Sequence, residues 1–108
     1  MTKHSMIVFN TTYCIDKSAV SEALGYLRDT YIPSVLISNL FTNPRLCRVL
    51  GSNDDEGENY SLQFEVESVE VLEKWYAEKG RALHEALVNR FGQQVAAFAT
   101  LLQPLEVV

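Results

Sequence analysis

The sequence is poor in the residues that build catalytic and metal centres. Its 108 residues include two cysteines and two histidines, and none of them has the spacing of a zinc site. A glycine-rich phosphate loop and a Ser/His/Asp arrangement are also absent. These absences argue against zinc proteins, nucleotide-dependent dehydrogenases, kinases and common hydrolases. The residue pattern therefore does not identify a reaction.

Basic residues and long apolar runs are scarce as well. Nine Lys and Arg residues are outnumbered by fourteen Asp and Glu residues, and the net charge of −5 would repel a phosphate backbone. No stretch approaches the roughly 18 apolar residues that a membrane-spanning helix needs, and residues 1–5 contain no apolar signal core. We therefore expect no nucleic-acid or membrane partner. Cys14 and Cys47 fit two unpaired thiols of a cytoplasmic protein.

Alternating apolar and polar residues predict strands. The clearest pattern runs from Tyr60 to Val66, where apolar residues alternate with Ser61, Gln63 and Glu65. Four strands are predicted in all, at about Met6–Cys14, Phe41–Leu50, Tyr60–Val66 and Gln94–Leu102. With helical patterns after the first and third, the order β-α-β-β-α-β predicts an α+β ferredoxin-like sandwich. In it, an antiparallel four-stranded sheet carries two helices on one face. Residues 6–108 would form this single domain after a polar leader at residues 1–5.

Local signals place the ends and irregularities of the first half. Asp16 is a good N-cap for the first helix, and Pro33 is expected to end or kink that helix near Tyr31 or Ile32. A further helical turn is expected between Ser34 and Asn39. Pro44 marks its strand as an edge strand or a bulge, because proline cannot donate a hydrogen bond to a neighbouring strand.

The second half has equally clear signals. Ser68 is expected to cap the second helix, Gly80 to interrupt it, and Gly92 to end it as a left-handed αL residue. The loop from Gly51 to Asn59 is strongly acidic. It lacks the ligand spacing of an EF-hand, so we interpret it as a solvated hairpin tip rather than a calcium loop.

The uncovered sheet face predicts a second protomer. The strand from Gln94 to Leu102 is apolar on both of its faces, so both should be covered. Helices cover one face only, and large apolar patches are uncommon on monomers. A two-fold homodimer that packs sheet against sheet, forming a dimeric α/β barrel, is the simplest arrangement that covers the other.

Several segments resemble a known family. The sequences MIVFNTTY, YIPSVL, RLCRVLG, YSLQFEV and HEALVNRFGQQVAAFATLL together look like a small bacterial family of domains of unknown function. The tail from Arg90 to Leu102 is the most specific part. More broadly, the chain is similar to the dimeric α/β-barrel superfamily. That superfamily includes haem-degrading and antibiotic-biosynthesis monooxygenases.

The broader resemblance implies an enzymatic alternative. Asn10, Trp75 and His84 resemble the residue types of the haem-degrading group, with His84 as haem ligand or general base. On an unbroken helix, however, the nine residues from Trp75 to His84 turn through about 900°, which puts the two side chains on opposite sides. A break at Gly80 would be needed to bring them together.

A binding site in the barrel is the leading interpretation. Its candidate ligand-binding residues lie on or beside the open sheet face: Asn10, Thr12, Arg48, Gln63 and Glu65. A carboxylate in an apolar cavity would have a raised pKa, but pairing across the dimer or contact with solvent is the simpler role for Glu65. We therefore predict a cytoplasmic homodimer that binds a small apolar or amphipathic molecule or serves as an assembly domain, without metal or cofactor. A monooxygenase, with or without haem, is the alternative.

Overall fold

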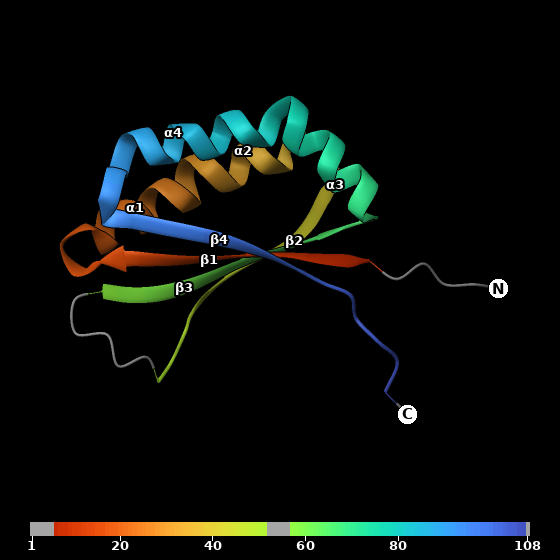
Figure 1. Cartoon of the computed structure of the whole chain (residues 1–108), viewed down its shortest axis with the longest axis horizontal. Helices are drawn as coiled ribbons and strands as arrows, with labels where there is room; N and C mark the ends of the chain where they lie inside the picture. The colour runs from red at the N-terminus through yellow and green to blue at the C-terminus, as the bar shows by residue number, and fades with distance from the viewer. Residues whose placement is uncertain (1–5, 52–56, 108) are drawn as a thin grey trace.

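The structure has two layers, a four-stranded sheet and a layer of helices that covers one of its faces (Figure 1). The computed structural model describes residues 6–51 and 57–107. Its strands are β1 (Ile7–Asp16), β2 (Phe41–Arg48), β3 (Gly57–Val66) and β4 (Val95–Leu102). They pair antiparallel in the order β2-β3-β1-β4, which confirms the predicted ferredoxin-like α+β fold.

Each helical connection is built from several pieces. The first contains the 3-10 turn η1 (Lys17–Ala19), α1 (Val20–Tyr26), the π-helical turn η2 (Leu27–Tyr31) and α2 (Ile32–Leu36). The second contains α3 (Val69–Trp75), the π-helical turn η3 (Tyr76–Gly80), α4 (Arg81–Phe91) and the 3-10 turn η4 (Gly92–Gln94). No helix in the described ranges is long and apolar enough to cross a bilayer.

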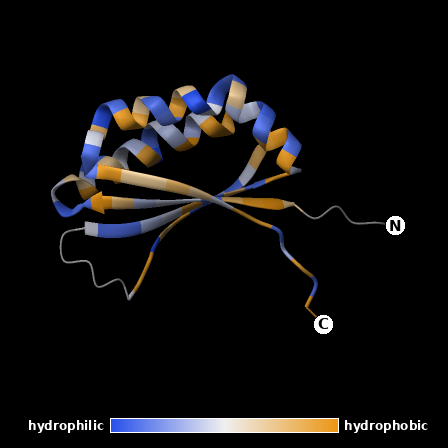
Figure 2. Ribbon diagram, in the orientation of Figure 1, coloured by the Kyte–Doolittle hydropathy of each residue, from blue (hydrophilic) through white to orange (hydrophobic). Residues whose placement is uncertain are grey.

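The core lies between the sheet and the helices. Alternate residues of β3, from Tyr60 to Val66, are buried between the two layers. Figure 2 shows hydrophobic and hydrophilic residues interspersed along the helices that cover the sheet. The register pairs Phe9 with Phe64 and Tyr13 with Tyr60, so the buried side chains of the two strands lie on the same face. From the helices, the buried core residues are Ala19, Ala23, Leu27, Tyr31, Val35, Leu72, Trp75, Leu87 and Phe91.

The strand ends differ from the predicted ones by a few residues. β1 continues to Asp16 and β3 begins at Gly57, because the two strands keep their backbone pairing to the last pair, Asp16 with Gly57. Backbone hydrogen bonds need no particular side chain, so alternation alone missed this extension. β2 ends at Arg48 rather than Leu50. The predicted leader at residues 1–5, and residues 52–56 of the predicted acidic loop, lie outside the described residues.

Pro33 does not end the first helix, but the helix is irregular at the predicted place, where the π-helical turn η2 ends at Tyr31 and α2 begins at Ile32. Pro33 lies in the first turn of α2, a position where proline is tolerated. Just before it, the Ile32 N–H donates to the Leu27 carbonyl five residues back, so the chain makes one wide turn instead of stopping. The helical path then continues to Leu36.

The predicted caps and bulge have mixed outcomes. Ser68 is confirmed as an N-cap, because its Oγ accepts from the Val71 N–H at 3.1 Å. Asp16 precedes η1, but in the described chain its side chain makes no capping hydrogen bond. Gly92 ends α4 with a positive φ of 57°, but its ψ of −130° lies outside the predicted αL region. The bulge beside Pro44 is confirmed by a register shift and by Asn43, which has a φ of 54°.

Gly80 is required by the close approach of an aromatic ring. A Cβ added there would lie 2.5 Å from Cζ3 of Trp75, a ring that is fully packed in the core. We predict that Gly80→Ala destabilises the protein by about 2 kcal/mol, because the indole must shift in a dense core. Gly25, on α1, has no atom within 4 Å of its added Cβ and provides the control. Chemical denaturation should show Gly25→Ala as neutral or slightly stabilising. Equal stability of the two variants would contradict the packing argument.

Candidate functional site

A groove opens between the second helical connection and the β1–β4 side of the sheet. It has a volume of about 520 Å³, and we call it the β4 groove. β1 contributes Phe9, Thr11 and Tyr13, and β4 contributes Ala97, Ala99 and Leu101. These β4 residues pair with the β1 residues in register, so small side chains on the edge strand leave space above them. The groove exists because β4 extends beyond the cover of the helices, leaving Ala99 and Leu101 exposed.

The helix side of the β4 groove combines apolar and polar groups. Leu72 and Ala77 line it together with the ring of Tyr76. Glu73, Arg81 and His84 also line it, one from α3 and two from α4. The groove therefore has a mainly apolar lining, and Glu73, Arg81 and His84 all lie on its helical side.

Two tyrosines form a hydrogen-bonded pair that contributes to the groove lining. Tyr13 from β1 and Tyr31 from η2 are both buried, and their hydroxyl groups hydrogen-bond to each other. Burial raises the pKa of Tyr31 to about 12, because a phenolate loses its hydration there. Burial likewise raises the pKa of Tyr13 well above its usual range, with the nearby Tyr31 as a smaller cause. The pair is therefore neutral at physiological pH.

The three residues of the enzymatic alternative are not brought together. His84 lines the β4 groove, but Asn10 lies on the opposite face of the sheet. Trp75 points toward the other edge of the sheet, where its ring packs on Phe41 of β2 with centroids 4.6 Å apart. The π-helical turn at Gly80 does interrupt the helix, as predicted, but it does not place Trp75 beside His84.

Four of the five predicted ligand-binding residues share the open face. Asn10 is paired with Gln63, Thr12 lies two residues along, and Glu65 follows Gln63 on the same face of β3. Asn10 donates to Thr12 Oγ1 at 3.3 Å and accepts a hydrogen bond from Ser61 Oγ. This group forms a half-buried polar row across the centre of the sheet.

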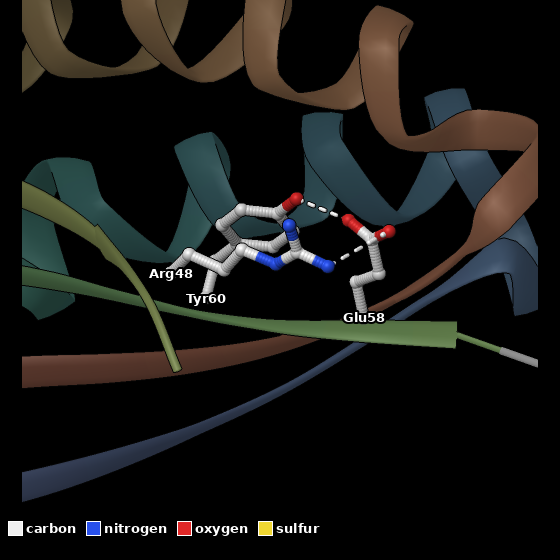
Figure 3. A network of polar contacts seen from close by, with 3 residues as sticks. All are labelled: Arg48, Glu58 and Tyr60. Atoms are coloured by element: carbon white, nitrogen blue, oxygen red, sulfur yellow. Dashed lines mark hydrogen bonds and ion pairs between the residues drawn. The ribbon is translucent and has the colours of Figure 1, made fainter. Parts of the chain in front are cut away.

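Arg48 is separated from that row. It is paired with Tyr60, so it lies on the helix-facing side of the sheet, at the edge formed by β2. Figure 3 shows its guanidinium beside Glu58, which also accepts a hydrogen bond from the Tyr60 hydroxyl. The ion pair spans 3.3 Å, and the hydrogen bond to Glu58 raises the pKa of Tyr60. Arg48 also lines a smaller pocket of about 330 Å³ beside Arg28.

Cysteine and acidic residues form no metal centre in the described chain. β3 separates Cys14 on β1 from Cys47 on β2, and both thiols are free. Among residues 6–51 and 57–107, no three His, Cys, Asp or Glu side chains gather as metal ligands do.

Sequence reasoning identified His84 but missed the rest of the groove. Thr11 and Tyr13 alternate with the open-face residues of β1, and their hydroxyls among apolar core residues are a signal for a polar pair or a pocket. Tyr76 and Arg81 gave no such signal. Their approach to the groove depends on the π-helical turn between them, which residue spacing does not indicate.

The architecture is that of a ferredoxin-like α+β domain. Residues 6–105 match the family described as the domain of unknown function DUF4286, and the chain belongs to that family. No curated protein matches the sequence.

Solved structures share this fold. A conserved protein of unknown function from Bacteroides thetaiotaomicron, described as a possible oxidoreductase, has a TM-score of 0.65 and 14% identity over 94% of this chain and 100% of that chain. A dimeric ferredoxin-like protein of unknown function from Thermobifida fusca has a TM-score of 0.60 and 10% identity over 96% of both chains. Another dimeric ferredoxin-like protein, from an uncultured marine organism, has a TM-score of 0.57 and 13% identity, covering 96% of this chain and 99% of that chain.

The buried tyrosine pair predicts an alkaline limit to stability. Tyrosine in the unfolded chain ionises near pH 10, whereas folded Tyr31 ionises near pH 12. Because the unfolded state loses its proton first, the free energy of unfolding should be highest below pH 10 and fall between pH 10 and 12. Urea denaturation across this range should show a shallower fall for Tyr31→Phe. An equal slope for the wild type and for Tyr31→Phe would contradict the prediction.

Proposed function

We propose that the protein is a homodimer that binds a small, mainly apolar molecule in the β4 groove. The observation that carries the proposal is the groove itself, whose volume of about 520 Å³ lies in the range of small-molecule sites. Its lining is apolar and aromatic with a few polar groups, the composition that such sites share. The cytoplasm of a bacterium, as expected from the sequence, fits this role.

The lining indicates what the groove accepts. Phe9, Leu72 and Leu101 line the groove with apolar side chains. Covering their remaining exposed surface would stabilise the complex with an apolar ligand. The Tyr76 ring offers a flat surface, which favours aromatic or planar ligands. The hydroxyls of Tyr13 and Tyr31 are hydrogen-bonded to each other, and Thr11 also bonds to Tyr13, so part of the hydrogen-bonding capacity of the pair is satisfied before a ligand covers it.

The open sheet face supports the homodimer. β4 presents Phe98, 58% exposed, and Leu102, 43% exposed, on this face. Within the polar row beside them, Asn10 is hydrogen-bonded to Thr12 and Ser61, and Glu65 accepts from Asn43 Nδ2 at 3.0 Å. Burying polar groups costs little free energy when their partners are in place. A second copy of the chain would therefore cover the apolar strip at low cost, and two of the similar solved structures are themselves described as dimeric.

The C-terminal segment extends the same surface. After β4 the chain leaves the sheet on the side away from the helices (Figure 1). Leu105, 78% exposed, and Val107, 94% exposed, lie on this segment. In the dimer, these side chains would gain cover from the partner.

The haem-using alternative is less well supported. Among its three residues, His84 alone lines the β4 groove, while Asn10 and Trp75 lie elsewhere. The set therefore does not fit a shared haem site, and we derive no reaction step through haem. Haem chemistry stays a prediction from the resemblance.

The groove can be tested with an uncharged dye, N-phenyl-1-naphthylamine, whose fluorescence rises in apolar surroundings. We predict saturable binding to the wild-type protein and its loss in Ala99→Trp, because a large side chain on the exposed groove wall would fill the space. Ala82→Trp places the same side chain on α4 outside the lining and should bind as wild type. Circular dichroism would verify that each variant is folded. Unchanged binding to Ala99→Trp would contradict the groove as the site.

The homodimer can be tested by light scattering after size exclusion. We predict twice the chain mass for wild type and a monomeric mass for Leu102→Asp, because two-fold symmetry buries the introduced charge twice. Ile37→Asp changes another exposed apolar residue, next to α2, and should leave the dimer intact. A wild-type monomer at micromolar concentration would overturn the dimer. So would a dimeric Leu102→Asp, since it would place the interface elsewhere.

A further inference from the structure

We infer that the ligand of the β4 groove is an amphipathic anion, whose acidic group is held at the α4 end by Arg81 and His84. The inference rests on the proposed function, and it adds the charge and the orientation of the ligand. Carboxylates and sulfonates attached to an apolar or aromatic body are the chemical class that fits.

Arg81 has an available positive charge. It begins α4, is exposed, and its Cζ lies 6.0 Å from the centroid of the Tyr76 ring. That distance is within the range of a cation–π contact, which holds the guanidinium against a ring that lines the groove. Within residues 6–51 and 57–107, Arg81 forms no ion pair with a carboxylate. Its planar fork of donors matches a carboxylate, which would fill this position.

His84 adds a second donor at the same end. It lies three residues after Arg81 on α4, a spacing that puts the two side chains on one side of the helix. It is half-buried and lines the groove. An imidazole N–H can donate to an anion that Arg81 already attracts.

Glu73 makes the two ends of the groove opposite in charge. It lies eight residues before Arg81, about 12 Å away along the helix at 1.5 Å per residue. Between the two ends, Tyr76 and Ala77 provide the middle of the helical wall. An anionic group is thus attracted at the α4 end and repelled at the α3 end. The apolar body of the ligand would extend along the groove toward Leu72.

A matched pair of dyes isolates the charge. 8-Anilinonaphthalene-1-sulfonate differs from N-phenyl-1-naphthylamine by its sulfonate, so the ratio of the two dissociation constants measures what the negative charge contributes. In wild type the sulfonate dye should bind more tightly. Arg81→Gln should weaken binding of the sulfonate dye about fivefold, equivalent to about 1 kcal/mol. It should change the dissociation constant of the neutral dye less than about twofold. His84→Gln should act in the same direction.

Three controls fix the location. Arg90→Gln removes the same charge from the same helix, but Arg90 packs on Tyr26 and Phe91 outside the groove, so both dyes should bind as wild type. Glu73→Gln should leave sulfonate binding unchanged or tighter. Ala99→Trp should abolish binding of both dyes.

The outcomes separate the two proposals. The anion inference is wrong if the two dyes bind to the wild-type protein with equal affinity. It is also wrong if Arg81→Gln and Arg90→Gln weaken binding of the sulfonate dye equally. In both cases the groove is still supported as a binding site. If Glu73→Gln weakens the sulfonate dye, the assigned orientation is wrong. If neither dye binds to the wild-type protein, the proposed function itself fails.

Discussion

The pairing of β1 with two neighbours constrains everything else in the structure. β1 hydrogen-bonds to β3 along its whole length and to β4 along eight residues. Because its side chains alternate strictly, each residue is assigned to the helix side or the open side, and the two partners follow the same assignment. Phe9 and Tyr13 thereby define the core, while Asn10 and Thr12 define the open face. A slip of one residue would exchange the two surfaces.

The helical layer has a second constraint, the π-helical turn before α4. The Arg81 N–H bonds to the Tyr76 carbonyl five residues back, which adds a residue to one turn. The extra residue rotates everything that follows about the helix axis. Gly80, within this turn, makes room for the Trp75 ring on the core side. Arg81 and His84 then face the β4 edge, so one local irregularity serves both the core and the groove.

The fold was predictable because period-two alternation and helical spacing are local signals that tertiary contacts reinforce. Ser68 and Pro44 were interpreted correctly for the same reason. Pro33 was interpreted correctly only as the place of an irregularity. The helix continues past it, since a wide helical turn absorbs a residue that usually ends a helix. The candidate site was harder. The resemblance to haem-degrading enzymes placed Asn10 and His84 in one predicted site. They lie on opposite sides of the sheet, and only the register of β1 reveals this.

The position of the groove at an edge strand also affects how fast a ligand would enter and leave. One wall is β4, whose residues Ala99 and Leu101 remain exposed along the opening. A ligand bound as we propose would therefore leave sideways past small side chains, without a helix or loop having to move first. Exchange would then be governed by encounter and by the strength of the contacts, not by a slow opening step. A ligand bound as we propose would also stay in contact with water along the opening.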